Sequence, residues 1–138
     1  EKEEKSARFI WKNEAFTIFA PWASVHPFEF WILPKKHHCS VLNLSQTEVR
    51  AFAETLRVSL GGLRPLLSDP PYNFGIHQIT TESCEHFHWH LEVYPKLTIW
   101  AGFEKSTGIF INVVSPEEAA ANLREAMLAE EKRLAIEG

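Results

Sequence analysis

The sequence has few cysteines and no long apolar run. Cys39 and Cys84 are the only cysteines among 138 residues. Two cysteines do not make the disulfide framework of a small secreted domain, so we expect reduced thiols in an intracellular protein. No apolar stretch approaches the ~18 residues of a membrane helix, and no signal-peptide pattern is visible. We therefore expect a cytoplasmic protein with no membrane partner.

Positive charge is also scarce. The 14 Lys and Arg residues against 18 Asp and Glu give a net charge of −4, which excludes the basic footprint of a nucleic-acid binder. Hydrophobic residues make up 45% of the chain and aromatic residues 12%, which is enough for a packed core. We expect one domain over residues 9–138 after a charged tail at 1–8. Because the chain begins at Glu1 rather than Met, we expect the physiological chain to be longer.

Residues 85–95, with the sequence EHFHWHLEVYP, are the most informative stretch. Side chains alternate between the two faces of a strand, so His86, His88, His90 and Glu92 would share one face and the apolar residues the other. The imidazoles could line a phosphate site, with one acting as the nucleophile. Two or three of them could instead bind zinc or iron, or the face could simply be solvated. The pattern favours a functional face, because histidine is titratable and has only modest strand propensity.

Hydrophobic periodicity predicts the remaining elements. A capping box, Ser45 with Glu48, begins a helix that ends near residue 67, and Gly61-Gly62 is expected to bend or weaken it. Ser115 begins a second helix, and residues 101–108 form a loop. The order predicts an α+β fold, with a mostly antiparallel sheet and two main helices. The expected strands cover residues 8–12, 15–20, 28–33, 72–80, 85–95 and 109–114.

Further candidate residues lie outside the histidine stretch. His77 is on the predicted strand 72–80, and antiparallel pairing could bring it beside His88 or His90. The run Lys35-Lys36-His37-His38-Cys39 follows the third strand. It is either a solvated basic turn or a source of positive charge or metal ligands near a phosphate site, although its spacing is a weak zinc signal. Glu104 is a conspicuous carboxylate in the predicted loop, and it could also be an ordinary solvated acid.

Two motifs resemble those of a known protein superfamily. Residues 86–91, HFHWHL, resemble the histidine-triad signature, and Leu33-Pro34-Lys35-Lys36-His37 resembles the strand-end motif of that superfamily. Longer stretches, including residues 26–35 and 114–120, resemble the second half of galactose-1-phosphate uridylyltransferase-like proteins. This resemblance covers nearly all of residues 9–125. It implies a HIT-like fold and a nucleotidyltransferase of galactose and carbohydrate metabolism that works through a nucleotidyl-histidine intermediate.

The resemblance also implies roles for individual residues. By position, His77, His88 and His90 match the metal ligands of the second half, with a fourth ligand, a glutamate, supplied by the first half. Glu104 matches the acid that contacts the sugar hydroxyls. The nucleophile motif of the first half, His-Pro-His, is absent from this sequence. The resemblance therefore implies an accessory half whose partner is a missing N-terminal HIT-like half or a second copy of the chain.

Three functions stay open at this point. The first is a nucleotidyltransferase-type domain that acts on nucleotide sugars and hexose 1-phosphates. The second is a nucleoside-phosphate hydrolase that uses the same residues, with water as the acceptor. The third is a non-catalytic domain in which a metal is bound and the sheet forms a dimer. If the chain is active alone, we expect His88 as the nucleophile, with the phosphate bound by Ser83, His86, His90 and Asn73.

Overall fold

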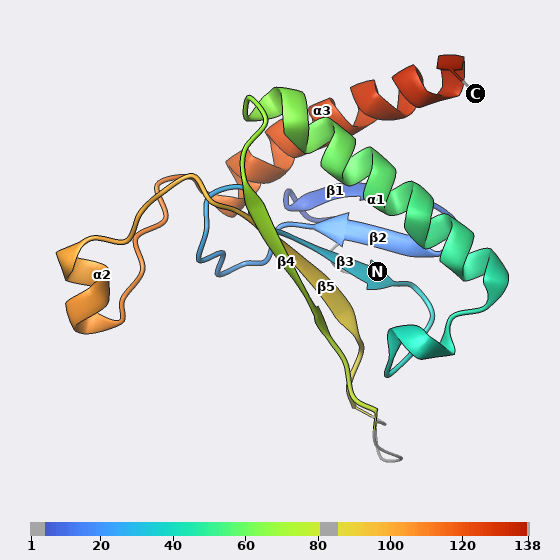
Figure 1. The fold of residues 1–138 in the computed structure, drawn as a ribbon, viewed down its shortest axis with the longest axis horizontal. Helices are drawn as coiled ribbons and strands as arrows, with labels where there is room; N and C mark the ends of the chain where they lie inside the picture. Colours follow the sequence, from blue (N-terminus) through green and yellow to red (C-terminus); the bar gives the residue numbers. More distant parts are fainter. Residues whose placement is uncertain (1–4, 81–85, 138) are drawn as a thin grey trace.

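The computed structural model describes residues 5–80 and 86–137 as a sheet with its two long helices packed on one face (Figure 1). The strand order is β1-β2-β3-β5-β4, and every neighbouring pair is antiparallel. This confirms the predicted α+β class and antiparallel sheet. The strands are β1 (Phe9–Lys12), β2 (Phe16–Phe19), β3 (Phe30–Pro34), β4 (Tyr72–His77) and β5 (His90–Pro95).

The two main helices begin where the capping residues predict. In α1 (Gln46–Leu66), the Ser45 hydroxyl accepts the Glu48 N–H at 3.3 Å, and the Glu48 carboxylate accepts the Ser45 N–H at 2.8 Å. In α3 (Pro116–Glu137), the Ser115 hydroxyl accepts the Glu118 N–H at 3.2 Å. These side chains satisfy N–H groups that have no partner within the helix, and so they fix both helix starts.

Gly61 and Gly62 lie where α1 packs against α3. A Cβ atom on Gly62 would lie 3.0 Å from backbone atoms of Ala126 and Met127. The helix continues through both glycines to Leu66, and Gly62 has a packing role that the sequence did not indicate. The missing side chains allow the two helix backbones to approach closely.

One face of the sheet carries the core. Alternation along β3 and β5 buries Phe30, Ile32, Leu91 and Val93 completely or almost completely. The same core includes residues of both helices, among them Val58, Leu63, Ala120, Leu123 and Met127. The intervening side chains of β3 and β5 point to the other face. That second face is where the candidate site lies.

Several predicted boundaries are wrong. Residues 109–114 pair with no strand within the described ranges, and the Asn112 amide anchors this segment by donating to the carbonyls of Ser24 and His26. The predicted loop 101–108 contains a short helix, α2 (Gly102–Thr107). β4 ends at His77, and β5 begins only at His90.

Cys39 is disulfide-bonded. The expectation of a reduced thiol is therefore wrong at this residue, and the cysteine argument for an intracellular protein no longer holds. Cys84 lies outside the described residues. None of the helices in residues 5–80 and 86–137 is long and apolar enough to cross a membrane.

Candidate metal and phosphate site

The pairing of β4 with β5 brings two histidines together. His77 lies directly opposite His90 in the register, which is one of the two pairings expected, and Gly75 lies opposite Glu92. Residues directly opposite one another project to the same face, and so do residues two apart along a strand. His77, His90 and Glu92 therefore converge on the face that the core does not use.

These three side chains form a compact cluster. The Glu92 carboxylate oxygens lie 3.4 Å from the Nε2 atoms of both His77 and His90. One possible ligand atom from each residue lies within 4.8 Å of the others. His90 and Glu92 are only 16% and 19% exposed, whereas His77 is 52% exposed and opens the cluster to solvent. Two imidazoles and one carboxylate are a donor set that zinc and iron use in proteins, so these residues fit such an ion.

The environment of His90 favours metal binding. Its Nδ1 lies 3.2 Å from the His88 carbonyl oxygen, which can only accept a hydrogen bond. The proton of a neutral ring is therefore on Nδ1, and the lone pair is on Nε2, which faces Glu92. The Trp31 ring stacks on the His90 ring, with 4.7 Å between centroids and 16° between planes. Both contacts fix the orientation of the ring.

His88 is not part of this cluster. It lies before the start of β5. The next residue, Trp89, is held by the rest of the fold: its N–H donates to the His38 carbonyl, and its buried ring packs against Phe16 and Phe52. The His88 Nε2 lies 2.6 Å from the Pro34 carbonyl oxygen, so this nitrogen carries the proton. In the neutral ring, Nδ1 is then the basic and nucleophilic atom.

The protonation of His88 is shifted by its surroundings. Burial lowers the pKa of the His88 imidazole, and the nearby imidazoles of His37, His38 and His90 lower it further. The hydrogen bond to Pro34 opposes this change without reversing it. The His37 and His88 rings are nearly perpendicular, with 5.3 Å between centroids and 85° between planes. His88 therefore remains neutral to a lower pH than an ordinary histidine.

The other predicted site residues are more dispersed. His86 is exposed and precedes β5, so the prediction of three imidazoles on one strand face is wrong. Asn73 is exposed on β4 and shares a face with His77. Glu104 lies in α2, on the arm that extends away from the sheet in Figure 1, and its carboxylate accepts the Ala101 N–H. Ser83 lies outside the described residues.

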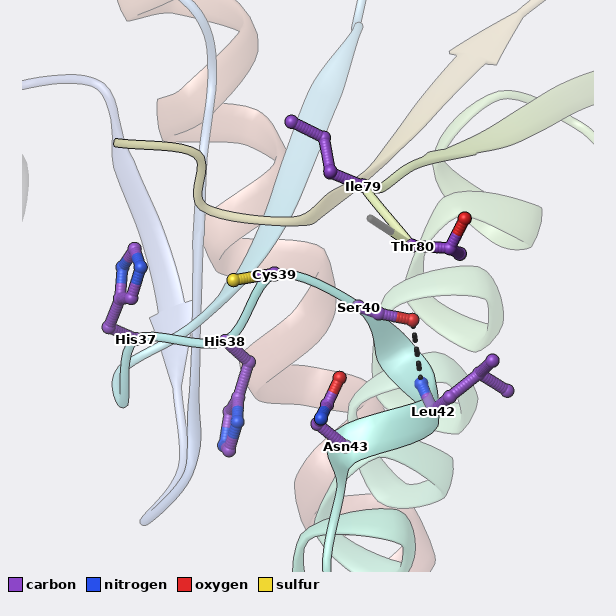
Figure 2. A pocket seen from close by; sticks show the side chains of 8 residues that line it. All are labelled: His37, His38, Cys39, Ser40, Leu42, Asn43, Ile79 and Thr80. Atoms are coloured by element: carbon purple, nitrogen blue, oxygen red, sulfur yellow. Dashed lines mark hydrogen bonds between the residues drawn. The ribbon is translucent and has the colours of Figure 1, made fainter. Parts of the chain in front are cut away.

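The run after β3 divides into two parts. His38 is buried, and its Nε2 lies 3.0 Å from a Glu48 carboxylate oxygen. This hydrogen bond, together with those from Ser45, lowers the pKa of Glu48 to about 2. His38 therefore joins the β3 end to the start of α1 and has a structural role. His37 and His38 both border an open pocket of about 430 Å³, whose other lining residues are Cys39, Ser40, Leu42, Asn43, Ile79 and Thr80 (Figure 2).

Comparison with known proteins identifies relatives of this chain, although no protein-family model matches it. It is 36% identical over 91% of its length to the ADP-glucose phosphorylase of Arabidopsis thaliana. It is 34% identical over 90% of its length to the galactose-1-phosphate uridylyltransferase of Thermotoga maritima. The chain spans only 37% and 42% of these two relatives, respectively.

Solved structures agree with these relatives. A uridylyltransferase structure superposes with a TM-score of 0.84 at 29% identity, over 92% of this chain and 43% of that one. A zinc-bound histidine-triad protein from Mycobacterium smegmatis superposes with a TM-score of 0.66 over 96% of this chain and 91% of that one. At 19% identity, the second likeness concerns the fold alone. The chain has a histidine-triad-like fold. Its sequence resembles galactose-1-phosphate uridylyltransferases and ADP-glucose phosphorylase.

Two residues of the site were missing from the predicted set. Alternation placed Glu92 on the same face as His90, but the predicted glutamate ligand was assigned to another half of the protein. The contact between Trp31 and His90 depends on the pairing of β3 with β5, in which Trp31 lies opposite Glu92. No local pattern in the sequence indicates that pairing.

Proposed function

We propose that this histidine-triad-like domain is part of a nucleotidyltransferase that acts on nucleotide sugars and hexose 1-phosphates. The observation that carries the proposal is its similarity, over nine tenths of the chain, to an ADP-glucose phosphorylase and a galactose-1-phosphate uridylyltransferase. Because the chain spans about two fifths of those relatives, the complete reaction is proposed for a larger assembly. The missing part would be an N-terminal HIT-like half, or a second copy in a homodimer.

The proposal includes a metal site. His77, His90 and Glu92 would hold a zinc or iron ion, in place of the predicted set His77, His88 and His90. The structure supports replacing His88 with Glu92 in this set. The Glu92 carboxylate lies 3.4 Å from both imidazoles, whereas the His88 ring is hydrogen-bonded to the Pro34 carbonyl. A bound divalent cation would supply positive charge beside a phosphate site and would hold β4 and β5 together.

His88 is the proposed nucleophile if the domain acts by itself. Its neutral Nδ1 would attack the α-phosphorus of a nucleotide sugar, and the P–O bond to the departing hexose 1-phosphate would break as the N–P bond forms. A second sugar phosphate would then attack the phosphorus and release the imidazole, whereas a hydrolase would use water. We propose Ser83, His86, His90 and Asn73 as phosphate contacts and Glu104 as a sugar contact.

A non-catalytic, metal-holding domain is the second candidate. The separation of His88 from the cluster favours it, since His77, His90 and Glu92 could bind an ion with no nucleophile present. In that case the sheet would serve dimerisation or docking onto a catalytic half. The two candidates differ in whether the chain alone forms a covalent bond to a nucleotide.

Intact-mass spectrometry separates these candidates. The protein is mixed separately with UDP-glucose, UDP-galactose and ADP-glucose, and the metal content of the same sample is measured. A mass gain equal to a uridylyl or adenylyl group (the nucleotide less one water), lost in His88→Ala and kept in His37→Ala, supports catalysis through His88. An adduct that survives in His88→Ala rules out His88 as the nucleophile. No adduct and no turnover, with about one equivalent of zinc or iron, supports the metal-holding role.

A further inference from the structure

A buried carboxylate lies one residue before β3 and has no role in the proposed reaction. Glu29 is 6% exposed, which is unusual for a glutamate unless its oxygens are bonded. One oxygen, Oε2, accepts the N–H groups of Val25 and His26 at 2.9 and 3.1 Å. The other, Oε1, accepts the indole N–H of Trp31 at 3.1 Å. Glu29 therefore fixes both the preceding loop and the Trp31 ring.

The Trp31 ring connects this carboxylate to the metal cluster. One of its neighbours is His90, whose ring it stacks on at 4.7 Å, and another is Phe19, at 6.3 Å. The His90 ring is in turn parallel to that of His77. A continuous series of contacts thus runs from Glu29 through the indole to the imidazoles of the cluster.

We propose that Glu29 and Trp31 are positioning residues for the His77–His90–Glu92 cluster. The carboxylate sets the indole plane through its N–H, and the indole sets the plane of the His90 ring. The Nε2 atom of His90 would then point at the position of a bound ion. Because the ring is already ordered when the protein folds, metal binding would not have to order it. This inference rests on the metal site of the proposed function.

Matched aromatic substitutions test the inference. Trp31→Phe keeps an aromatic ring beside His90 but removes the indole N–H, and Glu29→Gln keeps the side-chain volume but loses a carboxylate oxygen. Trp22→Phe is the control, because Trp22 is 78% exposed. The measurements are Co²⁺ affinity by competition with a chelator, the visible absorption spectrum of the bound Co²⁺, and the thermal midpoint of the metal-free protein.

We expect Trp31→Phe and Glu29→Gln each to weaken Co²⁺ binding by roughly tenfold, as is typical for partners of metal ligands, and to change the Co²⁺ spectrum. The double variant should bind Co²⁺ about as tightly as the single variant with the lower affinity. Both residues act through the same contact, that of Trp31 with His90, so their effects should not add. Trp22→Phe should match the wild type. If Glu29→Gln fails to fold, Trp31→Phe decides the question alone.

Two results would overturn the inference, and only one of them would also rule out the proposed metal site. A wild-type affinity and spectrum in Trp31→Phe would mean that Glu29 only holds the loop, and the proposed metal site would stand. A wild-type protein that takes up no Co²⁺, Zn²⁺ or Fe²⁺ would remove the metal site from the proposed function and this inference with it.

Discussion

The imidazole rings of His77 and His90 lie parallel across the β4–β5 pair, with 5.0 Å between centroids and 1° between planes. Glu92 projects from the same face and approaches the Nε2 atoms of both rings. Two imidazolium charges at this distance would repel one another, and the single carboxylate compensates only one of them. A divalent cation with both rings neutral satisfies all three side chains at once.

Removing one of the proposed ligands from this cluster should abolish tight metal binding. Groups that only hydrogen-bond to a metal ligand contribute up to roughly 100-fold in metal affinity. We expect His77→Ala and Glu92→Ala to lose more than this, because each removes an atom that would bind the ion directly. His86→Ala is the control, since His86 is exposed and outside β5. Metal stoichiometry by elemental analysis after gel filtration is the measurement. Unchanged stoichiometry in His77→Ala would remove His77 from the ligand set.

His88 should titrate below the usual histidine value of 6.5, because burial lowers its pKa. The folded protein then binds fewer protons at this site than the unfolded chain, so stability is full above pH 6.5 and decreases as the pH falls toward the folded pKa. Histidine resonances followed by NMR, assigned with His88→Gln, measure the midpoint. Urea unfolding at several pH values should show a smaller loss of stability for His88→Gln. A midpoint at or above 6.5 would contradict this prediction.

The helix contact at Gly62 should not tolerate a methyl group. An added Cβ would meet the α3 backbone, which cannot move aside independently, and overpacking of this kind costs about 1–3 kcal/mol. The helix propensity of alanine offsets about 1 kcal/mol of that cost. Gly61→Ala is the matched comparison, because the atoms nearest its Cβ would belong to the Glu130 side chain, which can move aside. We expect urea unfolding to show a clear loss of stability for Gly62→Ala and a smaller change for Gly61→Ala.

The start of α1 should carry an acid-sensitive contribution to stability. The hydrogen bonds from His38 and Ser45 lower the pKa of Glu48 from 4.5 to about 2. The contribution is therefore present above pH 4.5 and is lost as the pH falls toward 2. Glu48→Gln should be less stable than the wild type at pH 6, and the difference should narrow below pH 4.5 in urea unfolding. A difference that stays constant between pH 6 and pH 3 would contradict the prediction.

Local patterns predicted most elements of the fold. The capping residues Ser45 and Ser115 act within a single helical turn, so their positions in the sequence were sufficient. The β1–β2 hairpin is equally local: the Asn13 side chain accepts the N–H groups of Ala15 and Phe16 at 3.1 and 2.9 Å. The predicted strand at 109–114 failed because a strand needs a paired neighbour, and its apolar alternation carries no information about one.

The amino-acid sequence by itself determined the α+β class, the helix starts, and the presence of His77, His90 and Glu92 on strands whose alternation sends them to one face. Only the tertiary structure decided that His88 turns away toward Pro34 and that Glu92 completes the cluster in its place. The residue before β5, Trp89, is buried against Phe16 and Phe52, which are distant in sequence. Such packing is set by the assembled core, and no periodicity within one segment can predict it.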